Sequence, residues 1–322
     1  MGKSLGTFRA IYLVALCCVG SFLFAYDTGV IGGVLTLQSF QDDFNITAAN
    51  RATVASNATS LLQAGVATVI IPMYSAEMAP KEIRGKLGSM FHFFFTCGVM
   101  TSYWIDYGVS ENMPATSKQW QIPIGLQLVP GGILGLGMLL TKESTRWLAK
   151  TGETDQALQS LIWVRGGEDT TAVREEFAEI LAGIHEEERV TQGITWRELC
   201  LPANRFRLIL AMTLQLGAQL TGNTSLAYYA PQIFKAVGAG DSSLLMSGFF
   251  GVVKVVSCLF FLLFLVERIG RRGSLLGGAF LMGTFMLIIA VLSARYPPVE
   301  GQGVTPTGAA SVAMVYLEAS QY

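Results

Sequence analysis

The stretch Lys142-Glu-Ser-Thr-Arg-Trp-Leu148 follows directly on an apolar run, Trp120–Leu140, and opens a charged segment. A helix needs about 20 mostly apolar residues to cross the hydrocarbon core of a bilayer. The apolar run has that length, and the charged residues begin where it stops. The stretch therefore predicts the end of a membrane-spanning helix and the start of a segment in water.

The composition of the whole chain agrees with a membrane protein. Half of the 322 residues are hydrophobic (51%), only 14% are charged and the mean hydropathy is +0.46. We expect an all-α, polytopic transmembrane helical bundle of about seven full spans and a partial one. The expected full spans are Ile11–Leu35, Ala55–Met78, Leu87–Ile105, Trp120–Leu140, Leu208–Phe234, Leu244–Val266 and Ser274–Leu292, and the partial one is Thr307–Tyr322.

The lysines and arginines predict the orientation of these spans. With the N-terminus in the cytoplasm, most of the 22 basic residues fall on the cytoplasmic side, as the positive-inside rule requires. Only Arg51, Lys118, Lys235 and Arg295 fall outside. Residues 141–207 are then cytoplasmic, with two expected helices: Thr154–Val164, and one that carries Val173, Phe177, Ile180, Leu181 and Ile184 on one face.

Two further motifs lie at membrane–water boundaries: Pro72-Met-Tyr-Ser-Ala-Glu77-Met-Ala-Pro80-Lys-Glu-Ile-Arg84-Gly85 and Val266-Glu267-Arg268-Ile-Gly270-Arg271-Arg272. These two motifs and Lys142–Leu148, taken in their order along the chain, resemble the sugar porter family of the major facilitator superfamily, in its fungal hexose and quinate permease form. The resemblance implies a fold of two helical bundles joined by a cytoplasmic linker. It divides this chain into an N-terminal bundle (1–140), a linker (141–207) and a C-terminal bundle (208–322).

The resemblance also implies that parts of the family's length are absent. Ser60–Gly65 resembles the start of the family's second helix, whereas Val66–Tyr74 resembles the end of its fourth. We therefore expect a deletion of the third helix and parts of its neighbours at Gly65–Val66, and an end at Tyr322 inside the tenth helix. On this basis the 322 residues alone are expected not to transport, and a non-transporting isoform or sensor of the same fold is the alternative to a transporter.

Asp27, in Phe24-Ala-Tyr-Asp27-Thr-Gly29, lies near the middle of the first span. A carboxylate at membrane depth is costly and is a functional hypothesis by default. The resemblance implies that Asp27 is the site of proton coupling. The alternative is an acid that caps or packs near the outer end of the helix.

Polar residues follow a similar glycine-interrupted pattern in the stretch Gln215–Pro231. Amide and hydroxyl side chains suit a polyol because each can both donate and accept hydrogen bonds, and interrupted spans indicate a binding site at the membrane midplane. The resemblance implies that this stretch binds the sugar and that its tyrosine pair helps to close the outer gate. The expected substrate-binding residues are His92, Gln127, Gln219, Thr221, Thr224, Tyr228, Tyr229 and Lys254, with polar contacts between helices as the alternative role.

Lys254 stands in the apolar sequence Gly251-Val-Val-Lys254-Val-Val. It lies too deep in its span for the ammonium group to reach water easily, so it is expected to face a cavity or pair with an acid such as Asp27. A lysine in the cavity would be a counter-ion for a carboxylate substrate. A quinate-like polyol acid is therefore an alternative substrate to a hexose, and a structural ion pair is the competing role.

Charged residues at the cytoplasmic ends of the spans form the third predicted set. Opposite charges there can bind one another when the inside is closed and separate when it opens. The expected inner gate comprises Glu77, Arg84, Glu143, Arg146, Glu267, Arg268, Arg271 and Arg272.

No sequence motif for phosphate or metal binding occurs: neither Gly-Xaa4-Gly-Lys-Ser/Thr nor His-Glu-Xaa2-His is present. We expect no enzymatic activity, no cofactor, no metal and no nucleic-acid partner. The expected partners are a small sugar or polyol, protons and the lipid bilayer. The expected location is the plasma membrane.

Overall fold

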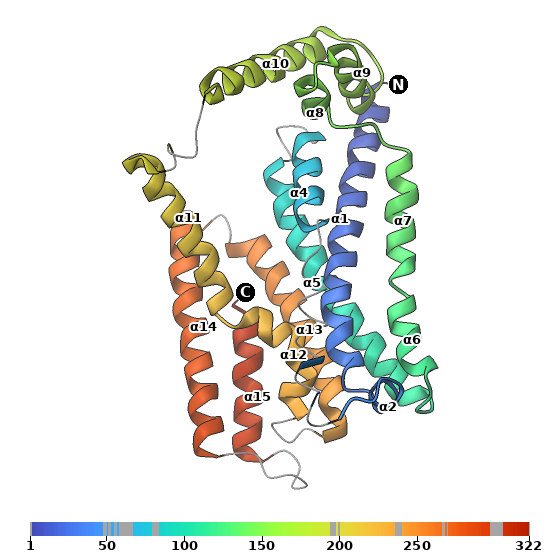
Figure 1. The fold of residues 1–322 in the computed structure, drawn as a ribbon, viewed down its shortest axis with the longest axis vertical. Coiled ribbons are helices and arrows are strands. Elements are labelled where there is room, and N and C mark those ends of the chain that lie inside the picture. The colour runs from blue at the N-terminus through green and yellow to red at the C-terminus, as the bar shows by residue number, and fades with distance from the viewer. Residues whose placement is uncertain are drawn as a thin grey trace. The chain divides into compact units, whose positions relative to one another are not determined.

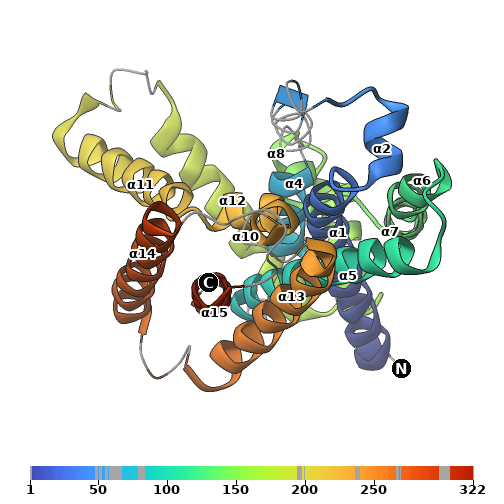
Figure 2. The ribbon, with the colours of Figure 1, turned by 90° about the horizontal axis from the view of Figure 1, so that it is seen from below.

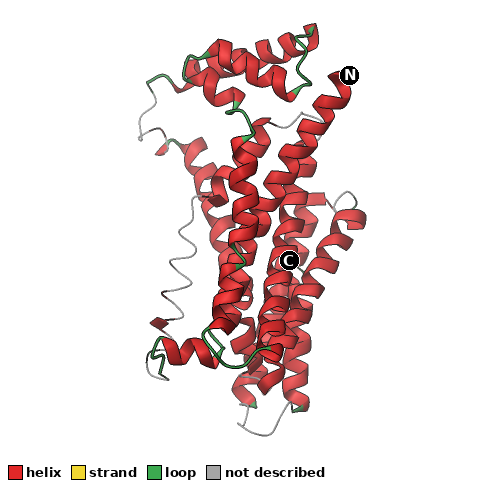
Figure 3. Ribbon diagram, turned by 90° about the vertical axis from the view of Figure 1, so that its right-hand side faces the viewer, coloured by secondary structure: helices red, strands yellow, loops and turns green. Residues whose placement is uncertain are grey.

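The computed structural model describes residues 2–47, 67–78, 84–193, 200–235, 240–265, 270–296 and 305–321, together with the single residues 50, 53, 54, 57, 198 and 268. Throughout these ranges the regular structure is helical (Figure 3), which confirms the all-α class. The longer helices are α1 (Gly2–Val34), α5 (Arg84–Asn112), α10 (Thr171–Thr191), α11 (Pro202–Leu220), α13 (Ser243–Phe260) and α14 (Gly270–Arg295). The shorter ones are α2 (Gln38–Asp43), α4 (Ala67–Met78), α6 (Lys118–Gly125), α7 (Leu128–Leu139), α8 (Thr145–Lys150), α9 (Thr154–Val164), α12 (Asn223–Phe234) and α15 (Pro306–Ala319), drawn in Figure 1.

The chain forms two compact units. Unit 1 comprises Met1–Val19, Thr68–Met90 and Ile133–Ala218, and unit 2 comprises Gly20–Ala67, Phe91–Gly132 and Gln219–Tyr322. The division into two bundles and a linker that the sequence suggests stays a prediction. The junction Gly65–Val66 lies outside the described residues.

Within unit 1, the charged segment after Leu140 folds into a small helical cluster. Helix α8 begins at Thr145 because Ser144 caps it, accepting a hydrogen bond from the Trp147 amide at 3.3 Å. The apolar face predicted from the sequence is confirmed: Ile184 of α10 is buried with residues of α8 and α9. The cluster consists of Leu148, Ala149, Ala157 and Ile184, with Phe177, Ile180 and Leu181 packed against it.

Four described helices are long and apolar enough to cross a membrane by length and composition. They are Gly6–Val34, Lys118–Leu139, Ser243–Leu265 and Arg272–Arg295. Large apolar side chains on α14 are exposed in the described part of the chain, among them Leu276 and Phe280, as expected for a helix surface that faces lipid. The chain is an integral membrane protein.

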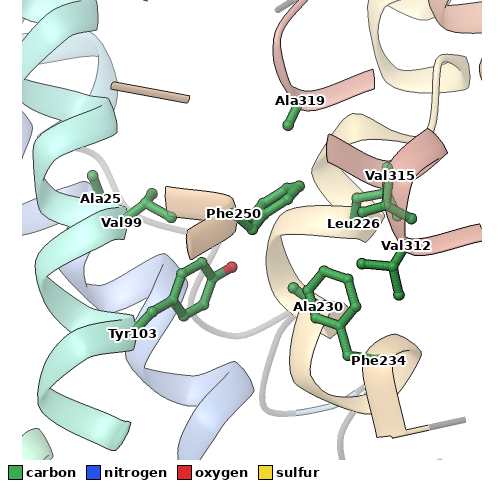
Figure 4. Packing of buried hydrophobic residues seen from close by; sticks show 10 residues of the cluster. All are labelled: Ala25, Val99, Tyr103, Leu226, Ala230, Phe234, Phe250, Val312, Val315 and Ala319. Atoms are coloured by element: carbon green, nitrogen blue, oxygen red, sulfur yellow. The ribbon is translucent and has the colours of Figure 1, made fainter. Parts of the chain in front are cut away.

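Unit 2 has an apolar core shared by five helices. Tyr103 of α5, Phe250 of α13 and Phe234 of α12 are completely buried in it. Residues of α1 and α15 complete this core (Figure 4), and α15 lies beside α13 and α14 (Figure 2).

The predicted span Leu208–Phe234 is broken into two helices. Helix α11 ends at Leu220 and α12 begins at Asn223, because Gly222 adopts a left-handed conformation (φ 81°) that other residues rarely take. Helix α1, in contrast, continues unbroken through its glycines at 29, 32 and 33. In the first span, therefore, glycine does not interrupt the helix.

The glycines of unit 2 allow helices to approach closely. A Cβ atom built on Gly98 of α5 would lie 2.8 Å from the Ala25 Cβ of α1 and closer still to the Phe22 carbonyl oxygen. A Cβ atom built on Gly33 of α1 would likewise overlap the Asp106 carboxylate of α5. Small residues are the usual means by which membrane helices pack tightly without a hydrophobic driving force.

Replacing Gly98 by alanine is expected to destabilise unit 2 because the added methyl group overlaps α1. Overpacking of this kind costs ~1–3 kcal/mol, which would lower the midpoint of thermal unfolding in detergent. The matched control is Gly108→Ala on the same helix, where nothing lies within 4 Å of the added carbon. Equal midpoints for the two variants would contradict the close packing of α1 on α5.

Candidate functional site

The break between α11 and α12 places a polar residue in the core of unit 2. Asn223 is the first residue of α12 and is buried. Its Oδ1 atom accepts a hydrogen bond of 2.8 Å from the Nζ atom of Lys254, which is also buried, in the middle of α13. A buried ammonium group needs such partners, because the loss of hydration is otherwise uncompensated.

A buried acid lies close to this pair. Glu318 of α15 has no exposed surface, and its charge interacts with that of Lys254. Both of its carboxylate oxygens are buried without a hydrogen-bond partner in the described part of the chain. We call Asn223, Lys254 and Glu318 the Lys254 cluster.

Apolar side chains enclose the Lys254 cluster. Phe250, one turn before Lys254, presents its ring 5.2 Å from Nζ, a distance at which a cation is attracted to an aromatic face. Leu226, one turn after Asn223 in sequence, belongs to the apolar core drawn in Figure 4, and so do Val315 and Ala319, which flank Glu318 along α15. Charges act strongly on one another in such surroundings because little water screens them.

Helix α5 contributes two residues to the same part of unit 2. His92 is half-buried, its ring stacks on that of Phe95 with centroids 6.0 Å apart, and it interacts with the charge of Lys254. Tyr103 donates its hydroxyl hydrogen to the carbonyl oxygen of Ala227 in α12. The predicted substrate residues His92 and Lys254 thus belong to one neighbourhood.

Two further acids lie where α1 approaches α5. Asp27 of α1 is half-buried, with a buried Oδ1 atom that has no hydrogen-bond partner among the described residues. Asp106 of α5 is completely buried, and neither of its carboxylate oxygens has a hydrogen-bond partner among the described residues. The charges of both acids act on Tyr26. Among the described acids, the one whose charge acts on Lys254 is Glu318.

The remaining predicted substrate residues lie at or near helix breaks. Thr224 donates a hydrogen bond of 3.0 Å to Oε1 of the exposed Gln219, so the two side chains bridge the break at Gly222. Thr221 is half-buried at the break, and Tyr228 is buried one turn further along α12, with Tyr229 half-buried beside it. Gln127 is half-buried in the turn between α6 and α7.

The predicted inner-gate residues of unit 1 have polar partners. Glu77 accepts a hydrogen bond from the Ser144 hydroxyl, and the Glu143 carboxylate accepts one of 2.9 Å from the Ser144 amide. Arg146 binds Glu187 of α10, an acid that the sequence analysis did not single out.

Lys150 also binds Glu187, with its Nζ atom 2.7 Å from Oε1. Hydrogen bonds from Lys150 and Arg146 hold the pKa of Glu187 below its usual range. Glu187 was missed because it stands among other acids on an exposed helix face, where sequence offers no signal. Of the other gate residues, Arg268 and Arg272 are exposed, Glu267 lies outside the described residues, and the side chains of Arg84 and Arg271 are not described.

Three buried polar residues of unit 2 were also missed: Asn223, Glu318 and Asp106. The two acids did carry a signal, since a charged residue inside an apolar stretch is rare and usually functional. The sequence signal for Asn223 was weaker and consisted of its position next to Gly222. Only the folded chain brings Asn223 and Glu318 to Lys254, because the three residues come from separate helices.

Comparisons with known proteins agree with this geometry. Residues 61–318 match the family described as Sugar (and other) transporter. The chain is 31% identical to the quinate permease of Emericella nidulans, over 84% of this chain and 63% of that protein. It is 30% identical to a probable quinate permease of Aspergillus flavus, over 86% of this chain and 64% of the relative. It thus spans just under two thirds of the length of these curated relatives.

Solved structures show the same fold. The proton:xylose symporter XylE bound to 6-bromo-6-deoxy-D-glucose superposes with a TM-score of 0.73 at 20% identity, over 98% of this chain and 79% of that one. XylE from E. coli in a partially occluded, inward-open conformation gives a TM-score of 0.72 at 18% identity, over 97% of this chain and 84% of that one. The fold is that of the major facilitator superfamily, as the sequence predicts.

Replacing Asn223 by alanine is expected to destabilise unit 2, because Lys254 loses a buried acceptor. Hydrogen bonds to charged groups contribute ~1.5–3 kcal/mol, which would lower the midpoint of thermal unfolding in detergent. Thr224→Ala is the matched control: it removes the bond to the exposed Gln219 and should change stability by less than ~0.5 kcal/mol. If both variants unfold at the same temperature, the Lys254–Asn223 bond does not stabilise the fold.

Proposed function

Because the chain belongs to the Sugar (and other) transporter family, we propose that it is a secondary transporter that moves a hexose or a related polyol across the membrane together with protons. It works by alternating access, and its activity is transport and not chemical conversion of the substrate. Its location is the plasma membrane.

The observation that carries this proposal is the broken helix in unit 2. Membrane helices are interrupted where irregular backbone faces a substrate, and polar groups gather at such breaks. Here the break at Gly222 is followed by Asn223, which holds the buried Lys254. In this proposal hydroxyl groups are bound by polar side chains along the chain near the break, namely Gln219, Thr221, Thr224, Tyr228 and Tyr229, and also by His92 and Gln127.

A polyol acid is the second candidate substrate. Two observations favour it: a buried ammonium group near the break, and relatives named quinate permeases. A neutral sugar gains little from a buried cation, whereas a carboxylate gains a charge-assisted hydrogen bond. Lys254 is the proposed counter-ion.

Asp27 is the proposed proton site. Its buried Oδ1 atom has no hydrogen-bond partner among the described residues, which makes the ionised form costly, and a carboxyl group in such a place can take up and release a proton as its access changes. The charged residues at the predicted cytoplasmic ends act as the inner gate. We propose that Glu187, which contacts Arg146 and Lys150, is also part of this gate.

The first test is substrate binding by the purified 322-residue chain. Labelled D-glucose, D-xylose and quinate are offered in a scintillation proximity assay, and saturable binding of at least one is expected. Gln219→Ala should weaken that binding ~10-fold through loss of a hydrogen-bonding group, whereas Gln121→Ala, at an exposed glutamine of α6, should not. Absence of saturable binding for all three compounds contradicts the proposed function.

The second test concerns proton coupling through Asp27. It uses vesicles with a proton gradient and a hybrid chain, in which the Emericella nidulans permease supplies the segments that this chain does not contain. The hybrid is expected to accumulate substrate, and Asp27→Asn to abolish accumulation but retain exchange, because exchange needs no net proton movement. A variant that accumulates substrate with unchanged pH dependence would show that Asp27 is not the proton site. Accumulation by the 322 residues alone would overturn the expectation that they cannot transport.

A further inference from the structure

Glu318 is a buried acid that the proposed roles leave unused. It has no exposed surface, and neither carboxylate oxygen has a hydrogen-bond partner in the described part of the chain. A carboxylate that is buried without donors is costly unless an opposite charge lies close by. The charge that acts on it is that of Lys254.

We propose that the Lys254 cluster is a carboxylate-binding site, in which protonation of Glu318 lets the carboxylate of a polyol acid take the place beside Lys254. The proposal rests on the transport function proposed above and names its substrate class. It also adds a second proton site, on α15, to the one proposed at Asp27 on α1.

Charge balance gives the reason for coupling. Without substrate, the ammonium of Lys254 and the ionised Glu318 neutralise each other in an apolar environment. A substrate carboxylate beside an ionised Glu318 would place two anions on one cation, which burial makes costly. When Glu318 takes up a proton, the substrate anion and Lys254 neutralise each other instead. One proton therefore enters with each anion, no bond other than O–H is formed, and the cluster stays neutral.

The hydrogen-bonding groups of the cluster suit a carboxylate. Lys254 donates to Asn223 Oδ1, so the amide nitrogen of Asn223 belongs to the same group of donors. An ammonium and an amide can thus bind the two oxygens of one carboxylate. The Phe250 ring near Nζ excludes water, which strengthens the interaction.

The titratable groups around Glu318 come from each helix that packs on α15 or on Lys254. Helix α13 contributes Lys254, and α12, which also packs on α15, carries the buried Tyr228. Helix α14 has no ionisable side chain between Arg272 and its last residue, Arg295. His92 of α5 interacts with Lys254. Because histidine side chains commonly titrate near neutral pH, His92 is the group whose ionisation the experiment must separate from that of Glu318.

The experiment compares quinate with its methyl ester, which has the same hydroxyl groups but no carboxylate. Binding to the full 322-residue chain in detergent is measured by calorimetry between about pH 5 and about pH 8. Quinate affinity is expected to fall as the pH rises, by up to ~10-fold per pH unit for a single linked proton, and the affinity for the ester to stay nearly constant. Repeating the titration in buffers of different ionisation enthalpy should show proton uptake with quinate and none with the ester.

Variants assign the effect to the cluster. The Glu318→Gln variant has no carboxyl group at this position, so its affinity for quinate should no longer change with pH. Lys254→Met should weaken quinate binding by ~10- to 100-fold, the loss expected for a charge-assisted hydrogen bond, and leave the ester within about twofold. Glu111→Gln, at an exposed acid near the end of α5, is the matched control and should retain the wild-type pH profile.

The outcomes separate this inference from the proposed function. If the chain binds neither quinate nor the ester nor a sugar, the proposed function itself fails. If it binds the ester or a sugar and quinate no better, the carboxylate site is absent while the proposed function stands. An unchanged pH profile in Glu318→Gln also overturns the inference, and loss of the profile in His92→Gln instead would assign the proton to His92. Should Glu318→Gln not fold, the buffer comparison on the unaltered chain decides: quinate binding without proton uptake overturns the proposal.

Discussion

The need to satisfy polar groups away from water governs this structure. In the hydrocarbon region a backbone N–H or C=O group has no water to bind, so the described spans are helices and each interruption needs local compensation. The break at Gly222 has it: the Gly222 amide donates to the Gln219 carbonyl at 3.4 Å, and the Gly222 carbonyl accepts from the Leu226 amide at 2.9 Å. The same constraint explains why Asn223 accepts a hydrogen bond from Lys254. In the function proposed above, the polar groups that stabilise the fold are also the ones that bind substrate.

Much of the fold could be predicted because membrane helices have a strong local signal. Apolar length, the distribution of basic residues and the boundary motifs each depend on neighbours in sequence. Helix α9 was predicted to its ends, Thr154–Val164, and the apolar face of α10 was predicted from its spacing. The break inside the predicted span Leu208–Phe234 was harder to predict, because a glycine such as Gly222 can also serve close helix packing, as Gly33 does in α1.

The candidate site could be predicted only in part. Asp27 and Lys254 stand out because each is a charged residue in an apolar run. The partner of Lys254 does not, since the choice of partner depends on tertiary contacts: Lys254 lies 31 residues from Asn223 along the chain, yet their side chains form a hydrogen bond. Glu318 carries the same local signal as Lys254 but stands in a short stretch, where an acid is easily taken for the edge of a span. The Glu187 contact with Arg146 and Lys150 lies on an exposed helix with many acids, and nothing local distinguishes it.

The hydroxyl of Tyr103 has a mechanical consequence for α12. Pro231 lies inside that helix, four residues after Ala227, and proline has no N–H to donate to the Ala227 carbonyl. Tyr103 supplies the missing donor from α5. The bending stiffness of α12 at this point is therefore set by a side chain of another helix and not by its own backbone. A tilt of α12 about Pro231 must either break that bond inside an apolar core or carry α5 with it, which makes the two helices one mechanical element.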